Sequence, residues 1–238
     1  MSNKGERKKI KALNAPRTVQ IDRKTIKWTV KTRAGTHKAN DSVSLGIVLR
    51  NYIKIANTLK EAKIALNNGE VMVNGKVRKG YRMGIGLFDV ITLTKAKKAY
   101  RATFDSKRRL RFNELEKLSN ERISKVEYKK VTKKGIQITT NDGSVFINDK
   151  ARVGDSLQIK DPTGKIESVL PLKVGSLVYV TKGKHCADKG TIKEIIEGTA
   201  RRKKLVKIEQ DGKIFETITN NVIVIGEKKA VISDLEKL

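Results

Sequence analysis

Charge is the feature that most constrains this chain. It holds 53 Lys and Arg against 25 Asp and Glu, a formal net charge of +28 over 238 residues. Repulsion on this scale destabilises a compact chain that stands alone, because folding brings like charges together. A polyanion removes that penalty, and nucleic acid is the commonest polyanion for a chain so basic. The sequence therefore predicts a nucleic-acid-binding protein.

Membrane, metal and cofactor chemistry find little support. No apolar run approaches the length of about 20 residues that spans a bilayer, and the basic start of the chain lacks the apolar stretch of a secretory signal. Cys186 is the only cysteine, so no internal disulfide can form and a reducing cytosol is expected. One cysteine with His37 and His185 cannot build an ordinary zinc site. We expect no metal, no cofactor and no membrane partner.

Aromatic and apolar content indicate how nucleic acid would be bound. Aromatic residues make up 5% of the chain, and Trp28 is its only tryptophan. Proteins that grip single strands need exposed aromatic platforms, so binding here should depend on phosphate contacts and on shape, which favours folded RNA. Hydrophobic residues amount to 38%, below the usual range of about 45–50%. This favours several small modules over one large core.

The first 40 residues read as a basic arm. They hold 12 Lys and Arg against 2 Asp and Glu, and they show no sustained periodicity. We expect an extended segment that orders on RNA, with a solvated, disordered tail as the alternative. Trp28 and Val30 alternate with polar residues and indicate a short strand. The arm's candidate RNA-binding residues near the start are Lys4, Arg7, Lys8, Lys9 and Lys11.

Residues 41–94 predict two helices, a hairpin and a strand. Leu45, Val48, Leu49 and Tyr52 follow helical spacing. Thr58 and Glu61 form a capping box that starts a second helix, whose free N–H groups could also meet a phosphate, and Gly69 stands where a helix-ending glycine is expected. Residues 71–73 and 76–79 flank Asn74-Gly75, the preferred dipeptide of a type I′ hairpin turn. Residues 88–93 predict a further strand.

The rest of the chain reads mainly as short strands. Between residues 95 and 172 we expect strands at 100–104, 136–139 and 145–147, separated by turns at 141–143 and 161–164. A short helix is predicted between Asn113 and Arg122. From residue 173 the alternation at 177–181, followed by apolar positions from 192 to 225, predicts a second β module. Gly183 should allow a tight turn with positive φ.

Two motifs carry a family resemblance. The helix–helix–hairpin unit with Asn-Gly-Lys-Val at 74–77 resembles the S-four RNA-binding domain, or alpha-L motif. Gly-Ser-Leu-Val-Tyr-Val-Thr-Lys-Gly at 175–183, running on to 189–192, resembles a KOW motif. With Ala-Pro-Arg at 15–17, Gly-Thr-His-Lys at 35–38, Phe-Asp-Val-Ile at 88–91 and the closing segment 220–226, nearly the whole chain resembles the ribosomal S-four family of the archaeal and eukaryotic "e" type. The chain stops soon after Gly226, which favours an archaeal member.

The resemblance implies an α+β multidomain fold and a role in translation. It gives a basic N-terminal arm (1–40), a small S-four-like domain (41–94), a central antiparallel β domain (95–172), a KOW SH3-like β-barrel (173–226) and a short C-terminal tail (227–238). The implied function is that of a structural constituent of the small (30S) ribosomal subunit in the cytoplasm. Its partners would be small-subunit ribosomal RNA and neighbouring ribosomal proteins, with no catalysis and no small-molecule substrate.

The resemblance also selects basic residues for RNA binding. The helix pair and hairpin would present one basic face made of Arg50, Asn51, Lys54, Lys60, Lys63, Lys76, Arg78 and Lys79. Further candidates follow from the other motifs and basic clusters: Arg17, His37, Lys38, Lys107, Arg108, Arg109, Lys182, Lys184, Lys189, Arg201, Arg202, Lys203 and Lys204. The alternatives are a solvated helix face, a solubilising hairpin tip, a protein-facing KOW surface and, for His37, a structural histidine.

Two other function classes stay open. An RNA-modifying enzyme can carry an S-four domain, but no phosphate-binding glycine motif is present, and the adjacent His185 and Cys186 are poorly placed to act as a base and a nucleophile. A KOW-type transcription or assembly factor is the second alternative.

Overall fold

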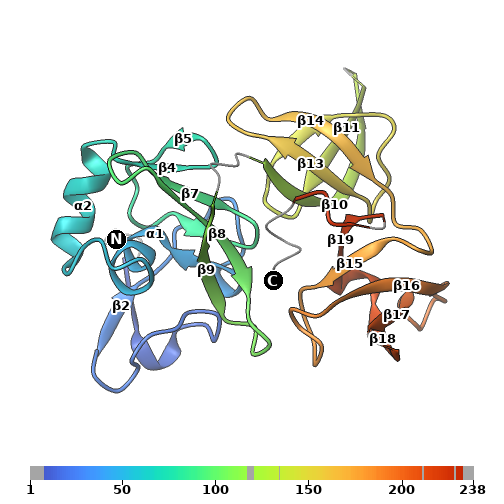
Figure 1. Cartoon of the computed structure of the whole chain (residues 1–238), viewed down its shortest axis with the longest axis horizontal. Helices are drawn as coiled ribbons and strands as arrows, with labels where there is room; N and C mark the ends of the chain where they lie inside the picture. Colours follow the sequence, from blue (N-terminus) through green and yellow to red (C-terminus); the bar gives the residue numbers. More distant parts are fainter. Residues whose placement is uncertain (1–7, 117–120, 134, 211, 228, 233–238) are drawn as a thin grey trace, which may run out of the picture. The chain divides into compact units, whose positions relative to one another are not determined.

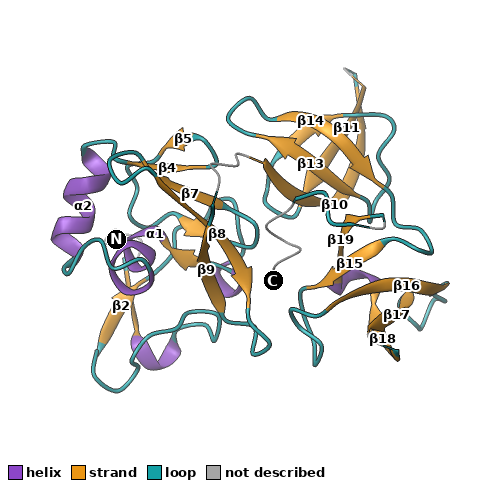
Figure 2. Ribbon diagram, in the orientation of Figure 1, coloured by secondary structure: helices purple, strands orange, loops and turns teal. Residues whose placement is uncertain are grey.

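A computed structural model describes residues 8–116, 121–133, 135–210, 212–227 and 229–232. Of the predicted RNA-binding residues, Lys4 and Arg7 lie outside this part. The chain divides into two compact units, one of Met1–Thr103 with Arg109–Leu118 and the other of Phe104–Arg108 with Ser119–Leu238. Most of the regular structure is strand, with a few short helices (Figure 1, Figure 2).

The first unit is built on a five-stranded sheet of order β5-β4-β7-β8-β9. Two small antiparallel pairs, β1–β2 and β3–β6, accompany it. The strand bounds are β1 Lys9–Lys11, β2 Trp28–Val30, β3 Val43–Ser44, β4 Val71–Val73, β5 Lys76–Val77, β6 Gly84–Ile85, β7 Val90–Leu93, β8 Lys98–Phe104 and β9 Leu110–Glu114. The helical bounds are η1 Ala12–Asn14, η2 Ala39–Asp41, α1 Leu45–Ile47, η3 Val48–Tyr52 and α2 Leu59–Asn67.

The first predicted helix is confirmed, with a wider second turn than expected. It begins as α1 and continues as the π-helical turn η3, in which the amide of Ile53 donates to the carbonyl of Val48. The predicted apolar stripe is buried, since Leu45 and Val48 are 0% exposed. Tyr52, the last residue of the stripe, packs edge-to-face against the ring of Phe112 in β9. This packing fixes the helical segment to the sheet.

Both predicted ends of α2 are confirmed. The Glu61 amide donates to the Thr58 hydroxyl at the N-cap. At the other end Gly69 has a φ of 76°, its amide donates to the Leu66 carbonyl, and the amide of the next residue donates to Ala65. This is a Schellman motif, which needs positive φ at the glycine position. Local sequence therefore sets the length of α2.

The Asn-Gly hairpin forms as predicted. Asn74 and Gly75 have φ values of 50° and 69°, and Val73 pairs with Lys76 in an antiparallel ladder. Asn74 does more than turn the chain. Its side-chain amide donates to Asp89 Oδ1, and its carbonyl oxygen accepts from the amide of Val90. The hairpin tip is thus tied to the start of β7.

The N-terminal segment differs from an extended arm over residues 8–40. Here β1 pairs with β2, and Ala12, Ala15 and Val19 are buried. The Arg23 guanidinium donates to the backbone carbonyls of Ala12, Leu13, Ala15 and Pro16. One charged side chain therefore satisfies several carbonyls of a segment without regular structure, which sequence periodicity cannot reveal.

The structure differs from the sequence expectation around residues 94 to 122. Strands β7 and β8 form an antiparallel hairpin that crosses the predicted boundary after residue 94. Strand β9 then extends the same sheet to Glu114, and β10 begins at Glu121. The helix predicted between Asn113 and Arg122 is therefore wrong at both ends. Sheet pairing with β8 overrides the helix-forming residues of this segment.

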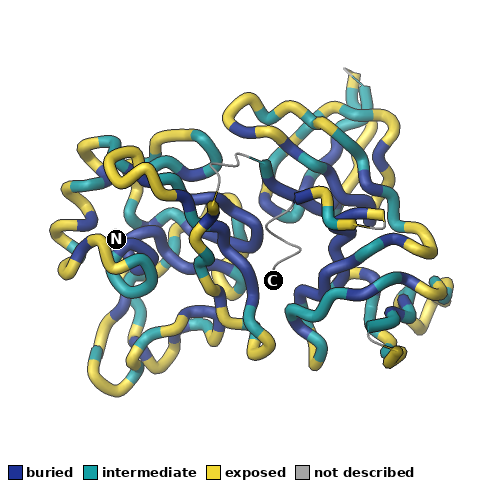
Figure 3. Tube along the Cα trace, viewed as in Figure 1, coloured by how far each residue is buried: buried dark blue, intermediate teal, exposed yellow. Residues whose placement is uncertain are grey.

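The second unit contains two five-stranded antiparallel sheets, of order β12-β11-β10-β13-β14 and β18-β17-β16-β15-β19. Every residue of β19 is buried, whereas the edge strands β12 and β18 contain no buried residue (Figure 3). The strand bounds are β10 Glu121–Thr132, β11 Gly135–Thr140, β12 Val145–Ile147, β13 Ser156–Lys160, β14 Lys165–Leu170, β15 Leu177–Val180, β16 Lys189–Ile196, β17 Leu205–Gln210, β18 Lys213–Ile218 and β19 Val222–Gly226, with the turn η4 at Thr219–Asn221.

Buried polar groups join these two sheets. The Lys125 ammonium of β10 donates to the carbonyls of Thr219 and Val222 at 2.6 and 2.7 Å. The Ser156 hydroxyl of β13 accepts from the Val224 amide of β19 at 3.0 Å. Burial lowers the pKa of Lys125 to about 8. The two sheets therefore share a polar seam besides their apolar contacts.

This buried lysine predicts a pH effect on stability. Between about pH 8 and pH 10.5 the unfolded chain keeps the Lys125 proton more often than the folded chain does, so the free energy of unfolding should rise with pH. Between these two pH values, the free energy of unfolding of the wild type should rise by up to about 3 kcal/mol more than that of Lys125→Met. Urea unfolding at the two pH values measures it. Lys130→Met, on the exposed end of the same strand, should keep the wild-type slope, and an equal slope in Lys125→Met would contradict the prediction.

Arg122 anchors a second buried polar cluster at the start of β10. Its guanidinium forms ion pairs with Asp142 and with Asp161, the latter at 2.8 Å, and donates to the Ser144 hydroxyl at 3.1 Å. The side chains of Arg122, Asp142 and Asp161 are 10%, 4% and 5% exposed. The guanidinium holds the two predicted turns at 141–143 and 161–164 against one strand.

Candidate RNA-binding surface

Helix α2 presents two of the predicted lysines to solvent. Lys60 and Lys63 are three residues apart and both exposed, so they share one face of the helix. The ammonium of Lys63 lies 4.5 Å from the ring centre of Tyr81. The same helix buries Ala62 and Leu66 on its other side. The amphipathic pattern therefore turns this part of the predicted basic face outward.

The N-terminus of α2 is a poor place for a phosphate. The Glu61 carboxylate accepts from the Asn57 amide at 2.8 Å and from the Thr58 hydroxyl at 2.9 Å. Hydrogen bonds from Asn57 and Thr58 lower the pKa of Glu61. An ionised carboxylate thus already lies at the positive end of the helix, contrary to the phosphate site that the sequence suggested.

The remaining predicted residues of this face lie beside α2 in the chain. Lys54, Lys76 and Lys79 are exposed, whereas Arg50, Asn51 and Arg78 are half-buried. Arg50 Nε donates to Asn51 Oδ1 at 2.7 Å, so this donor and this acceptor are already used within the pair. The lysines are the freer donors of the helix and hairpin set.

A buried cluster around Asp89 positions the hairpin. Asp89 Oδ2 lies 2.8 Å from His37 Nε2 and accepts from the Gly86 amide at 2.9 Å, while Oδ1 accepts from Asn74. Burial would raise the pKa of Asp89, but the charge and hydrogen bond of His37 and the bonds from Asn74 and Gly86 outweigh it and lower that pKa. The carboxylate therefore stays ionised inside the unit.

His37 is a structural histidine in this arrangement. Its side chain is 6% exposed, and a Cβ on Gly86 would lie 2.4 Å from its ring, so only glycine fits there. Of the two interpretations open for His37, hydrogen bonding to Asp89 is the one that the geometry favours. Its neighbour Lys38 is exposed.

Asp89→Asn should destabilise the first unit by about 2 to 3 kcal/mol, because an amide nitrogen would replace an oxygen that accepts hydrogen bonds. Chemical denaturation measures the loss, and Asp22→Asn, at an exposed position in the same unit, is the matched control. Since the folded pKa of Asp89 lies below 3.8, its contribution should be complete above that pH and lost as the pH falls further. Equal stability of the two variants would contradict this role.

The predicted basic residues of the second sheet of unit two lie on its loops, except Lys189, which begins β16. Lys184 is exposed in the loop after β15, where Gly183 has a φ of 101°, and Lys182 and Lys189 are half-buried. His185 stacks on Phe215 with 4.0 Å between ring centres, and its Nδ1 lies 3.1 Å from Asp188 Oδ2. The loop is held by these side chains and leaves Lys184 at its tip.

The four-residue basic run divides into three exposed residues and one paired lysine. Arg201, Arg202 and Lys203 are exposed between β16 and β17, whereas Lys204 forms an ion pair of 2.6 Å with Glu197. A cross-hairpin pair of this kind is invisible in a linear charge count. The run therefore offers three outward cations instead of four.

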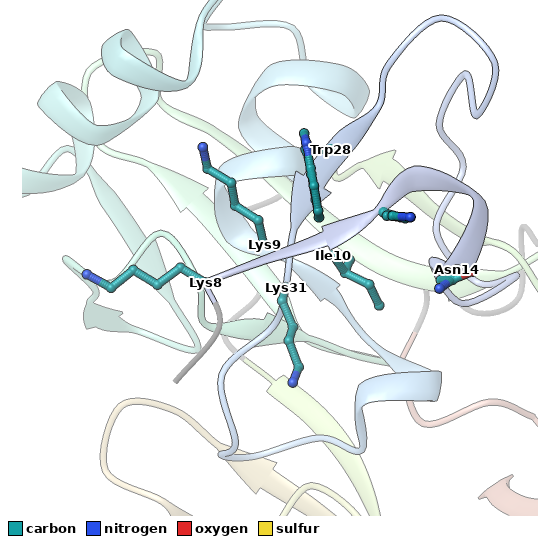
Figure 4. Close-up of a pocket in the computed structure, with 7 residues that line it drawn as sticks. Lys8, Lys9, Ile10, Asn14, Trp28 and Lys31 are labelled. Atoms are coloured by element: carbon teal, nitrogen blue, oxygen red, sulfur yellow. The ribbon is translucent and has the colours of Figure 1, made fainter. Parts of the chain in front are cut away.

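Two further basic groups complete the predicted set. Lys107 and Arg109 are exposed on the turn between β8 and β9, with Arg108 half-buried and at a φ of 57°. In the N-terminal segment Lys8, Lys9, Lys11 and Arg17 are exposed. The structure also adds residues that the charge pattern did not select: Lys31 and Trp28 join three of these lysines around one pocket (Figure 4).

Cys186 cannot serve as a nucleophile paired with His185. Its thiol is buried and donates to the Thr181 carbonyl at 3.3 Å, while His185 is engaged with Asp188. Burial raises the pKa of Cys186 to about 11, which disfavours the reactive thiolate. Within the described residues, no group of three or more His, Cys, Asp or Glu side chains could hold a metal ion. No helix in the same part of the chain is long and apolar enough to cross a membrane.

Comparison with known proteins decides the family. Residues 4–40 match the RS4NT (NUC023) domain, and residues 96–166 match the ribosomal family S4e. The small ribosomal subunit protein eS4 of Methanosphaera stadtmanae is 36% identical over 236 residues, 98% of this chain and 98% of that protein. This chain belongs to the S4e family of ribosomal proteins.

Other S4e relatives agree over the same length. The small ribosomal subunit protein eS4 of Methanocaldococcus jannaschii is 34% identical over 98% of this chain and 99% of its own. The crystal structure of the 30S ribosomal protein S4e from Thermoplasma acidophilum superimposes with a TM-score of 0.70 at 30% identity, covering 81% of this chain and 99% of that one. The predicted family is thus confirmed, and the enzyme alternative is dropped because S4e proteins are structural ribosomal proteins.

Proposed function

We propose that this S4e chain is a structural constituent of the small ribosomal subunit and binds small-subunit ribosomal RNA through its exposed cations. The observation that carries the proposal is the net charge of +28 on a chain that matches small ribosomal subunit proteins over 98% of its length. Its place is then the ribosome in the cytoplasm, beside neighbouring ribosomal proteins.

Binding would be electrostatic. Lysine ammonium groups act as point charges toward phosphate oxygens, and arginine guanidinium groups can contact two oxygens at once. The exposed members of the predicted set, such as Lys60, Lys63, Lys76, Lys79 and Lys184, extend into solvent from sheets, a capped helix and tied loops. Rigid supports of this kind let the cations match the shape of a folded RNA.

We further propose the domain assignment that the sequence suggests. Residues 41–94 would be the S-four-like RNA-binding domain, supported by the helical pair and the Asn-Gly hairpin. Residues 173–226 would be the KOW SH3-like barrel, supported by the five-stranded order β18-β17-β16-β15-β19. Residues 1–40 would be the basic arm and 227–238 the tail. The central β domain predicted at 95–172 would begin at β10, because β8 and β9 complete the sheet of the first unit.

Stoichiometry on purified subunits tests this function. The tagged chain should co-sediment with small subunits at one copy per particle and should stay there after a high-salt wash. The same experiment addresses the remaining alternative, a KOW-type transcription or assembly factor, which would be substoichiometric and would wash off. Recovery of most of the chain in the free fraction would refute the structural role.

A further inference from the structure

The sheet formed by β1 and β2 carries an exposed aromatic platform. Its register places Lys11 opposite Trp28 and Lys9 opposite Val30. Because side chains alternate across a strand, Lys9, Lys11 and Trp28 lie on one face of this sheet. The opposite face carries Thr29, which is 5% exposed, whereas Trp28 is 48% exposed. The indole is therefore presented to solvent beside two cations of the neighbouring strand.

The strand pair borders a pocket of about 970 Å³. Its lining includes Lys9, Lys11 and Trp28 of this face together with Lys8, Ile10 and Lys31, which the same alternation places on the other face. Figure 4 shows Trp28 and Lys9 rising on the same side of the strand pair, with Lys8 and Lys31 spread away from it. Asn14 is the remaining lining residue, so none of the lining residues is acidic. An exposed indole with Lys9 and Lys11 on its own face, and with Lys8 and Lys31 extending from the same strand pair, selects a ligand with a flat face and negative charge.

We propose that this pocket binds one unpaired nucleotide of ribosomal RNA, with the base stacked on Trp28 and the adjacent phosphates paired with the surrounding lysines. The inference rests on the proposed function and adds a base contact to it. Unstacked bases in loops and bulges of folded RNA stack on aromatic side chains, whatever the base, because every base has a π-face. Asn14 supplies a donor and an acceptor within reach of the pocket for a base edge.

RNA fits this surface better than a protein segment does. A peptide would have to bring several carboxylates together to match four lysines, whereas an RNA strand carries a phosphate at every nucleotide. A peptide would also leave the indole face without a planar partner. The low aromatic content of the chain fits this proposal, because one stacked base at Trp28 leaves phosphate contacts to supply most of the binding.

The intrinsic fluorescence of the intact chain tests the stacking directly, because Trp28 is its only tryptophan. A short oligoadenylate should quench the indole emission saturably. Inorganic polyphosphate, which carries similar charge without bases, should bind but quench far less. If polyphosphate quenches as strongly as oligoadenylate, or if oligoadenylate binds without quenching, the stacking site is refuted.

Variants at the same position give a second, independent measurement. Trp28→Ala and Trp28→Leu should weaken oligoadenylate binding by about 5- to 150-fold, whereas Trp28→Phe should keep most of the affinity. Trp28→Leu retains the apolar cover of the sheet, so it separates stacking from folding, and circular dichroism checks all three. Polyphosphate affinity should stay the same throughout.

Wild-type oligoadenylate affinity in both Trp28→Ala and Trp28→Leu would overturn the proposal. It would do so even if these variants lost a contact with a ribosomal protein, because Trp28 would then face a protein and not a base. That result would leave the one-to-one presence of the wild-type chain on small subunits untouched. Failure of the stacking site and failure of the proposed function are therefore distinguishable.

Discussion

Raising the salt concentration from about 50 to about 200 mM should weaken binding of this chain to small-subunit RNA by about 10³- to 10⁵-fold, if about six to ten phosphates are neutralised. Each lysine or arginine that pairs with a phosphate releases condensed counterions, so affinity falls as a power of the salt concentration. Filter binding across a salt series measures the log–log slope, with about −0.7 to −0.9 expected for each phosphate. A flat response would contradict electrostatic binding.

The slope also locates the contacts. Changing Lys60, Lys63, Lys76 and Lys79 together to Gln should reduce the magnitude of the slope by about three, if each lysine meets one phosphate. All four are exposed on α2 and the hairpin segment, so the fold should be unaffected. Lys95→Gln is the matched control, because Lys95 is exposed on the same unit but forms an ion pair with Glu70 at 2.6 Å. An unchanged slope in the fourfold variant would place the contacts elsewhere.

Arg122→Met should cost the second unit about 3 to 5 kcal/mol of unfolding free energy, because two buried carboxylates lose their guanidinium partner. Adding Asp142→Asn and Asp161→Asn to the same variant should recover part of the loss, since the orphaned charges are then removed. Urea unfolding of the three proteins measures both steps.

Arg152→Met is the control for this cluster, because Arg152 is exposed in the same unit and its expected effect is within about 0.5 kcal/mol. If Arg122→Met falls in the same range, the ion pairs contribute little to stability. If the neutralised triple variant is no better than Arg122→Met, the loss comes from packing and not from unpaired charge.

Features set by neighbouring residues were predictable from the sequence. The start of α2 depends on Thr58 and Glu61, its end on Gly69, and the hairpin on Asn74 and Gly75, all within a few residues of the structure they specify. The exposure of most predicted lysines follows equally from their high cost of burial. These elements explain why the helix and hairpin part of the candidate surface could be placed from the sequence.

Features set by distant residues were not predictable in the same way. The burial of Asp89 depends on His37, 52 residues away, and the pairing of β8 and β9 with the first sheet decides against the helix expected at 113–122. The ion pair of Lys204 with Glu197 forms only once β16 and β17 meet. The proximity of Trp28 to Lys11 arises only when β1 pairs with β2.

The polar seam of the second unit fixes the order in which its parts can pack during synthesis. The acceptors of Lys125 are 94 and 97 residues further along the chain, so at about 5–20 residues per second they are synthesised about 5 to 20 seconds after it. Until then the Lys125 ammonium group stays hydrated, and the sheet built on β10 cannot yet pack against β19. A nascent chain in this interval exposes the surface of the β10 sheet that η4 and β19 later cover.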